Sequence, residues 1–207
     1  QSGLLLDGER LYVATHLGCV ACIDAPSGAV RWLTRYRRSE FPAEEQVAAL
    51  RWNRGADAMA LQGDRLVVVA ADSPRVFALN RFTGETLWST RRELMNDAYC
   101  VLGATEEEVV LMGESVYWLD AANGQVKACY PERWAGAEAA SLSPHAALGR
   151  GIWAGDAVWL PTRETILRLQ LLSEGKVAAT APLTLPERGS LRGNLAYHDG
   201  RLYWASE

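Results

Sequence analysis

Short apolar runs of strand length, each closed by a turn containing glycine or aspartate, recur from one end of the chain to the other. The clearest unit places an apolar run after Gly63-Asp64-Arg65, a second run at Val76–Asn80, and a Thr83-Gly84 turn before Trp88. Runs rich in β-branched and aromatic residues between such turns are typical of strands joined as hairpins. The pattern therefore predicts an all-β chain built from one repeated unit.

The repeat returns at intervals that fit propeller blades. The apolar residues that anchor successive units are Leu11, Leu66, Val109, Val158 and Leu202, at spacings of 55, 43, 49 and 44 residues. A blade of four short strands needs about 40–50 residues. Helical solenoids do not fit the β-rich runs, and most gaps are too short for the crossover helix of a parallel α/β fold. We therefore expect a β-propeller of four-stranded antiparallel blades.

The units divide the 207 residues into four blades and the first half of a fifth, within one propeller segment. The expected blades span 1–36, 55–92, 98–130 and 147–182, with a partial blade at 190–207. Two segments that break the rhythm, 33–54 and 131–146, are expected to be inserted loops, the first with a short helix after Pro42. Because the last hairpin lacks two outer strands, we expect the segment to belong to a ring of seven or eight blades.

The turn that follows the third strand of a unit has the same hydrogen-bonding residues in three of the units. An aspartate or asparagine there can accept hydrogen bonds from backbone N–H groups two or three residues later. Its positions are Asp24, Asn80 and Asp120. A glycine four residues further on supplies the positive φ that closes the hairpin. Its positions are Gly28, Gly84 and Gly124. We expect these residues to shape the repeat and to take no part in catalysis.

A tryptophan stands four residues beyond the first two of these glycines, at Trp32 and Trp88. An indole there can bury its apolar face between neighbouring blades while its N–H reaches a backbone carbonyl. The third unit has Ala128 at the equivalent place, so the repeat weakens towards the C-terminal half.

The pattern Ala78-Leu79-Asn80, Thr83-Gly84 and Trp88 resembles the PQQ-like (quinoprotein alcohol dehydrogenase-like) propeller repeat, and the likeness covers nearly the whole chain. Val68–Ser73 and Val158–Arg163 look like the multi-blade PQQ-like repeat proteins of planctomycete-type bacteria. A more distant similarity is to the propeller lipoprotein of the bacterial outer-membrane β-barrel assembly machinery, which binds protein partners and no quinone. The resemblance implies a propeller and a location in the periplasm or cell envelope.

The quinoprotein enzymes of this superfamily hold their cofactor with a stacking tryptophan, a disulfide between adjacent cysteines, calcium ligands and a catalytic aspartate. This sequence has no adjacent cysteine pair, and its acidic residues fall mostly in hairpin turns. Membership of a fold does not carry an activity with it. We therefore expect no catalytic residue, no metal site, and neither PQQ nor another cofactor.

Charge and cysteine usage exclude further classes. A net charge of −4 gives no reason to expect nucleic acid as a partner. No apolar run approaches the roughly 20 residues of a transmembrane helix. Cys19 and Cys22 have a C-x-x-C spacing but fall within an expected strand, where residues three apart point to opposite faces and make a poor zinc site.

The expected function is therefore protein–protein interaction or scaffolding, with another protein or further propeller blades of the same chain as the partner. Inserted loops on a rigid fold commonly carry binding. The candidate interaction surface consists of Arg37, Arg38, Trp52 and Trp134. One alternative is part of a quinone- or metal-dependent oxidoreductase. Another is a carbohydrate- or envelope-polymer-binding module, which predicts at least two of Trp52, Trp134 and Trp153 exposed on one face.

Overall fold

The computed structural model describes most of the chain, and every structural statement below concerns that part. The described residues are 3–15, 17–38, 59–70, 72–95, 98–113, 115–131, 147, 149–162, 165–184 and 193–204. The inserted segments expected at 33–54 and 131–146, with the short helix after Pro42, lie largely outside them.

Four antiparallel sheets of four strands and one hairpin follow one another along the chain. Blade 1 contains β1 (Gly3–Asp7), β2 (Arg10–Ala14), β3 (Cys19–Asp24) and β4 (Val30–Arg35). Blade 2 contains β5 (Met59–Gln62), β6 (Arg65–Val68), β7 (Arg75–Asn80) and β8 (Thr86–Arg91). Blade 3 contains β9 (Cys100–Ala104), β10 (Glu108–Met112), β11 (Val116–Asp120) and β12 (Val126–Tyr130).

Blade 4 contains β13 (Ile152–Ala154), β14 (Ala157–Pro161), β15 (Thr165–Leu171) and β16 (Val177–Thr184), and the last hairpin pairs β17 (Leu195–His198) with β18 (Arg201–Trp204). Two short 3-10 turns, η1 (Arg92–Leu94) and η3 (Ser173–Gly175), are the described helical elements. β4 includes Leu33–Arg35, so it extends into the range expected to be an inserted loop.

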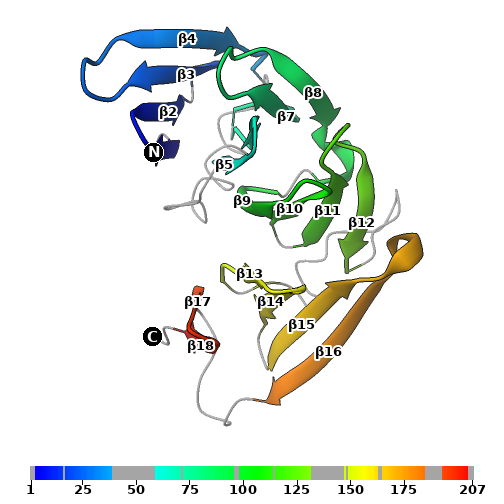
Figure 1. Ribbon diagram of the computed structural model, residues 1–207. Coiled ribbons are helices and arrows are strands. Elements are labelled where there is room, and N and C mark those ends of the chain that lie inside the picture. Colours follow the sequence, from blue (N-terminus) through cyan, green and yellow to red (C-terminus); the bar gives the residue numbers. More distant parts are fainter. Residues whose placement is uncertain are drawn as a thin grey trace.

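The sheets are arranged along an arc, with the first strand of each sheet on the concave side and the fourth strand on the convex side (Figure 1). Within each sheet, strands that follow one another in sequence pair with each other, and all of these pairings are antiparallel. The prediction of an all-β propeller built from four-stranded antiparallel blades is confirmed, and about four and a half blades are present. A complete ring of seven or eight blades stays a prediction.

The hydrophobic core is divided among the interfaces between blades. Tyr12 and Trp32 of blade 1 pack against Leu66 and Phe77 of blade 2 in one buried cluster. A second cluster lies between blades 2 and 3, a third between blades 3 and 4, and a smaller one between blade 4 and the last hairpin. Because alternate residues of a strand point to opposite faces, each central blade contributes one face to each of two clusters.

The turns after β3, β7 and β11 share one hydrogen-bonding pattern. Asp24 Oδ1 accepts from the Ser27 N–H at 3.0 Å. Asn80 and Asp120 accept from the N–H groups two and three residues later. The glycines that close these turns have φ of +73°, +77° and +73°, a region that strains other residues. They are Gly28, Gly84 and Gly124.

Two tryptophans join consecutive blades through these turns. The Trp32 indole N–H donates to the Arg81 carbonyl at 3.0 Å, and the Trp88 indole N–H donates to the Ala121 carbonyl at 2.9 Å. A Cβ added to Gly84 would lie 2.7 Å from the Trp32 ring, and one added to Gly124 would lie 2.4 Å from the Trp88 ring. We call this packing of an indole on the next blade's turn glycine the Trp–Gly contact.

A threonine two residues beyond each tryptophan adds a second bond to the same turn. Thr34 Oγ1 donates to the Gly84 carbonyl at 2.5 Å, and Thr90 Oγ1 donates to the Gly124 carbonyl at 2.7 Å. Between blades 3 and 4 the corresponding residues of β12 are Ala128 and Tyr130. That interface is filled by other side chains, including Trp118 and the half-buried Trp153. The sequence Trp-x-Thr thus marks the first two interfaces only.

Candidate functional site

Two of the four residues of the candidate interaction surface lie in the described part of the chain, directly after β4. Arg38 forms an ion pair with the buried Asp72, with Nε 3.3 Å from Oδ2. Arg37 lines a pocket between blades 1 and 2. Trp52 and Trp134 lie outside the described residues.

Asp72, in the loop between β6 and β7, joins blade 2 to blade 1. Its Oδ2 accepts from the Gly18 N–H at 3.0 Å, and its Oδ1 lies 2.5 Å from the Tyr36 hydroxyl oxygen. The Tyr36 hydroxyl oxygen is also 2.6 Å from the Thr15 carbonyl oxygen, and its single proton can be donated to only one of them at a time. Hydrogen bonds and the Arg38 charge thus compensate the burial of this carboxylate.

Burial raises the pKa of Tyr36, and the neighbouring Asp72 raises it further. A raised pKa in the folded state means that folding favours the protonated phenol. This contribution to stability is fully present below the ordinary tyrosine pKa of about 10 and is lost as the pH rises above it. The network between the two blades is therefore sensitive to alkali.

Replacement of Tyr36 by phenylalanine is expected to lower the free energy of unfolding by about 1–2 kcal/mol at neutral pH, because a buried acceptor loses its donor. The difference from the wild type should shrink above about pH 10, since only the wild type loses the Tyr36 contribution. Urea unfolding of both proteins, from neutral pH to above about pH 10, measures this difference in the free energy of unfolding. Tyr197→Phe, at a side chain 47% exposed, is the control. Parallel pH profiles for Tyr36→Phe and the wild type would contradict the assignment.

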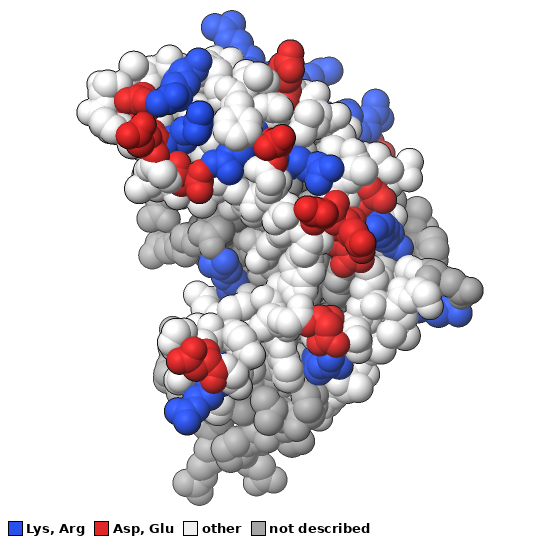
Figure 2. Space-filling view, in the orientation of Figure 1, with Lys and Arg blue, Asp and Glu red and all other residues white. Residues whose placement is uncertain are grey.

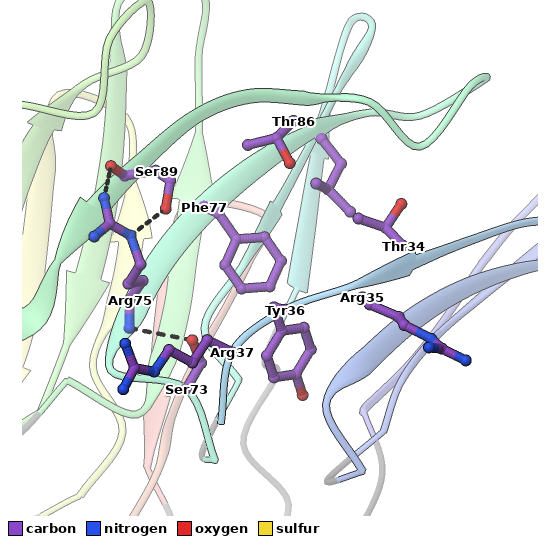
Figure 3. A pocket seen from close by; sticks show the side chains of 10 residues that line it. Thr34, Arg35, Tyr36, Arg37, Ser73, Arg75, Phe77, Thr86 and Ser89 are labelled. Atoms are coloured by element: carbon purple, nitrogen blue, oxygen red, sulfur yellow. Dashed lines mark hydrogen bonds between the residues drawn. The ribbon is translucent and has the colours of Figure 1, made fainter. Parts of the chain in front are cut away.

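The pocket beside this network has a volume of about 180 Å³ and lies between the outer strand of blade 1 and the outer two strands of blade 2 (Figure 3). The Phe77 and Tyr36 rings meet there with centroids 5.3 Å apart. Arg75 donates from Nε to Ser89 Oγ at 2.5 Å and from Nη2 to the Ser89 carbonyl at 2.7 Å. The residues that line the pocket are Thr34, Arg35, Tyr36, Arg37, Ser73, Arg75, Phe77, Leu79, Thr86 and Ser89.

Three of the lining side chains are guanidinium groups, and the lining contains no carboxylate and no histidine. Within the described residues, none of Arg35, Arg37 and Arg75 forms an ion pair with a carboxylate. Elsewhere acidic and basic side chains are interspersed, as on the face shown in Figure 2. The pocket therefore combines an apolar wall with uncompensated positive charge, which suits a ligand that carries carboxylates.

The lining offers hydroxyl groups without a general base to activate them, so the arrangement suits binding better than nucleophilic catalysis. The four cysteines are free, and Cys19 and Cys22 both lie in β3. Among the described residues there is no group of three histidine, cysteine, aspartate or glutamate side chains that could hold a metal ion. No described helix has the length and apolar character needed to cross a membrane.

Sequence reasoning missed most of this pocket. Tyr36 and Asp72 are separated by 36 residues and meet only because blades 1 and 2 pack together. Arg75 and Ser89 lie on neighbouring strands, so their contact follows from the strand pairing. The one local signal was Asp72-Ser73-Pro74, a polar turn that departs from the Asp-x-x-x-Gly turns of the repeat.

The family model PQQ_2, described as outer membrane protein assembly factor BamB, matches residues 1–127 and, in an overlapping match, residues 39–206. A comparison with curated proteins found no match. The resemblance of two segments to planctomycete-type repeat proteins is not tested by these findings and stays a prediction.

Several solved structures share the fold. BamB from Moraxella catarrhalis is 17% identical with a TM-score of 0.58, and the alignment covers 97% of this chain and 53% of that one. The computationally designed Ika8 protein is 13% identical with a TM-score of 0.59, covering 98% and 54%. A europium-containing methanol dehydrogenase is 13% identical with a TM-score of 0.55, covering 87% and 39%. The chain thus spans about half the length of the first two structures.

Proposed function

Because the chain belongs to the family described as outer membrane protein assembly factor BamB, we propose that it is a non-catalytic protein-binding module of the cell envelope. The observation that carries the proposal is the arginine-lined pocket between blades 1 and 2, which joins positive charge to an apolar wall without a nucleophile–base pair. Pockets on rigid β-scaffolds are well placed to bind partners, since the scaffold fixes the contacting side chains.

The partner we propose is an extended protein segment with acidic side chains. Such a segment would place carboxylates near Arg37 and Arg75 and a small apolar side chain against Phe77. Arginine forms strong, geometrically defined hydrogen bonds with carboxylates. The outer strand of each blade also has one edge without a pairing strand within its sheet, and an extended segment can add to such an edge.

Replacement of Arg37 by glutamate is expected to weaken binding of a fluorescent peptide of alternating glutamate and valine by roughly fivefold, because an attraction becomes a repulsion. Arg37 is exposed, so the fold should be unaffected. Fluorescence anisotropy measures the affinity, which should fall as salt is raised from about 0.05 M to about 0.5 M.

Arg201→Glu makes the same charge change on the exposed surface of β18, far along the chain from the pocket, and is the matched control. An equal loss of affinity in both variants, or equal binding of a lysine–valine peptide, would contradict the pocket as the binding site. A stable complex with PQQ and calcium would favour the oxidoreductase alternative instead. Fractionation of cells that produce the full-length protein tests the envelope location.

The carbohydrate-binding alternative rests on Trp52, Trp134 and Trp153, and one of these three lies in the described part of the chain. Trp153 is half-buried against the cluster between blades 3 and 4, and its ring lies 3.0 Å from the position of a Cβ added to Gly103. It is therefore poorly placed to stack on a sugar. Trp52 and Trp134, the other two residues of that hypothesis, lie outside the described residues.

A further inference from the structure

Two of the arginines that line the pocket are particular to the interface between blades 1 and 2. In the repeat, the place of Arg75 is taken in blade 3 by Ser115, and the place of Arg37 is taken after β8 by Glu93. The same blade structure therefore forms with a serine and a glutamate at these places. The requirements of the repeat do not account for the two arginines of the pocket.

The guanidinium group of Arg75 is held along one edge and available along the other. Its Nε donates to Ser89 Oγ at 2.5 Å, and its Nη2 donates to the Ser89 carbonyl at 2.7 Å. Its Nη1 donates to no residue in the described part of the chain. A guanidinium edge formed by two nitrogens can bind both oxygens of one carboxylate. Because Ser89 fixes its orientation, Arg75 is a preorganised donor for such a group.

A buried hydroxyl group lies in the same pocket. Ser73 is 1% exposed, and its Oγ accepts from the Arg75 backbone N–H at 3.1 Å. Among the described residues, no acceptor takes the hydroxyl proton of Ser73. In the view of Figure 3, the guanidinium groups of Arg37 and Arg75 lie on the same side of the Phe77 ring. The pocket thus gathers donors for one anionic group beside an apolar wall.

The pocket is small and is bounded by contacts between the two blades. Its volume of about 180 Å³ is below the roughly 300–1,000 Å³ of pockets that hold drug-sized ligands. Thr34 Oγ1 donates to the Gly84 carbonyl, and the Tyr36 hydroxyl oxygen lies 2.5 Å from Asp72 Oδ1. These two contacts begin two residues apart, or about 7 Å along the chain, so a polypeptide cannot pass between the blades there. A chain end or a single side chain can enter.

An anion site and an apolar wall in so small a pocket favour the last residue of a chain. In an extended segment, neighbouring side chains point to opposite sides, and those on one side are about 7 Å apart. An internal glutamate and an internal valine therefore cannot both enter. The last residue carries a carboxylate and a side chain on the same Cα atom. A free amino acid would also bring an ammonium group, for which the lining offers no carboxylate.

We propose that the pocket binds the carboxy-terminal residue of the protein partner, and that this residue has a small apolar side chain. Its carboxylate binds Arg75 and Arg37, and its side chain contacts Phe77. Acidic side chains earlier in the partner contact the exposed Arg35. This inference rests on the function proposed above and specifies which part of the partner enters the pocket. Capture of a terminal carboxylate is a known mode of peptide recognition.

Two fluorescent peptides test the proposal. Both carry the label at the amino end, alternate glutamate with valine and end in valine, but one has a free carboxylate and the other a carboxamide. The carboxamide peptide has one further glutamate beside its label, so the net charges are equal. We expect fluorescence anisotropy to show roughly tenfold weaker binding of the carboxamide peptide, because it lacks the charge-assisted hydrogen bonds. Glycine in place of the last valine of the free peptide should weaken binding about threefold, because the apolar contact is lost.

The outcomes separate this inference from the function on which it rests. Equal affinity for the two peptides, with Arg37→Glu weakening both, would overturn recognition of the chain end and leave the binding of acidic segments in place. Binding of neither peptide would overturn both proposals. Weaker binding of the carboxamide peptide supports both.

Arg75→Lys tests which side chain holds the terminal carboxylate. Lysine keeps the charge but lacks the guanidinium edge, so the roughly tenfold preference for the free carboxylate should fall to about twofold. Arg168→Lys, at an arginine that pairs with Asp156 in blade 4, is the matched control and should keep the full preference. Circular dichroism checks that both variants fold, and the two peptides decide the proposal on the unmodified protein in either case. An unchanged preference in folded Arg75→Lys would overturn the placement of the carboxylate in the pocket.

Discussion

Replacement of Trp88 by alanine is expected to lower the free energy of unfolding by about 3–5 kcal/mol, the range for deleting a large buried aromatic side chain. The indole is buried between blades 2 and 3, and its N–H donates to the Ala121 carbonyl at 2.9 Å. The variant loses the apolar contacts and leaves that carbonyl without its donor. Urea unfolding followed by circular dichroism gives the total loss.

Amide hydrogen exchange should show in which blades Trp88→Ala loses stability. Because each blade contacts mainly its neighbours, exchange in Trp88→Ala should accelerate in blades 2 and 3 more than in β17 and β18. Trp88→Phe keeps most of the apolar volume and should cost less than the alanine variant. Trp204→Ala, at a side chain 46% exposed, is the control and should cost under about 1 kcal/mol. Equal losses at Trp88 and Trp204 would show that the indole does not join the blades.

Alanine at Gly124 is the second substitution with a large expected effect. Gly124 has φ of +73°, which by itself costs an L-residue about 1–2 kcal/mol. The new Cβ would also lie 2.4 Å from Cε3 of Trp88 and 2.6 Å from Oγ1 of Thr90. Relieving this overlap should add about 1–3 kcal/mol to the loss.

Gly28→Ala is a matched control for the cost of the steric overlap at Gly124. Gly28 has the same φ of +73° and the same turn, but its added Cβ has no neighbour within 4 Å. The difference between the two alanine variants, measured by urea unfolding, therefore reports the overlap alone. If Gly28→Ala costs as much as Gly124→Ala, backbone strain accounts for both and the close approach of the indole has no energetic role.

The fold followed from sequence because its signals are local and repeated. The hydrogen bonds of Asp24 and Asn80 are made two or three residues away, and alternating apolar residues define each strand face. The structural role of Trp32 could be predicted for a similar reason, because a tryptophan stands four residues after the turn glycine in two units. What each indole contacts, at Gly84 and Gly124, needed the structure, because those contacts cross from blade to blade.

The candidate site was much less predictable. Arg37 was predicted because it falls in the segment expected to be an inserted loop, whereas Arg75 lies in an ordinary strand and differs only in the charge that it brings to the pocket. Asp72 reads as a loop residue in sequence, and its burial arises from Gly18 and Tyr36 of the neighbouring blade. Contacts that depend on how the blades pack together leave no periodic pattern in the amino-acid sequence.

Coupling between Trp88 and Gly124 tests most directly the claim that an indole seated on a turn glycine holds one blade to the next. The cost of Gly124→Ala is measured twice by urea unfolding, in the wild type and in Trp88→Ala. If the claim holds, removing the indole lowers this cost by about 1–3 kcal/mol towards that of Gly28→Ala, and the remaining difference comes from Thr90 Oγ1, which still lies 2.6 Å from the new Cβ. The same cost of Gly124→Ala with and without the indole would contradict it.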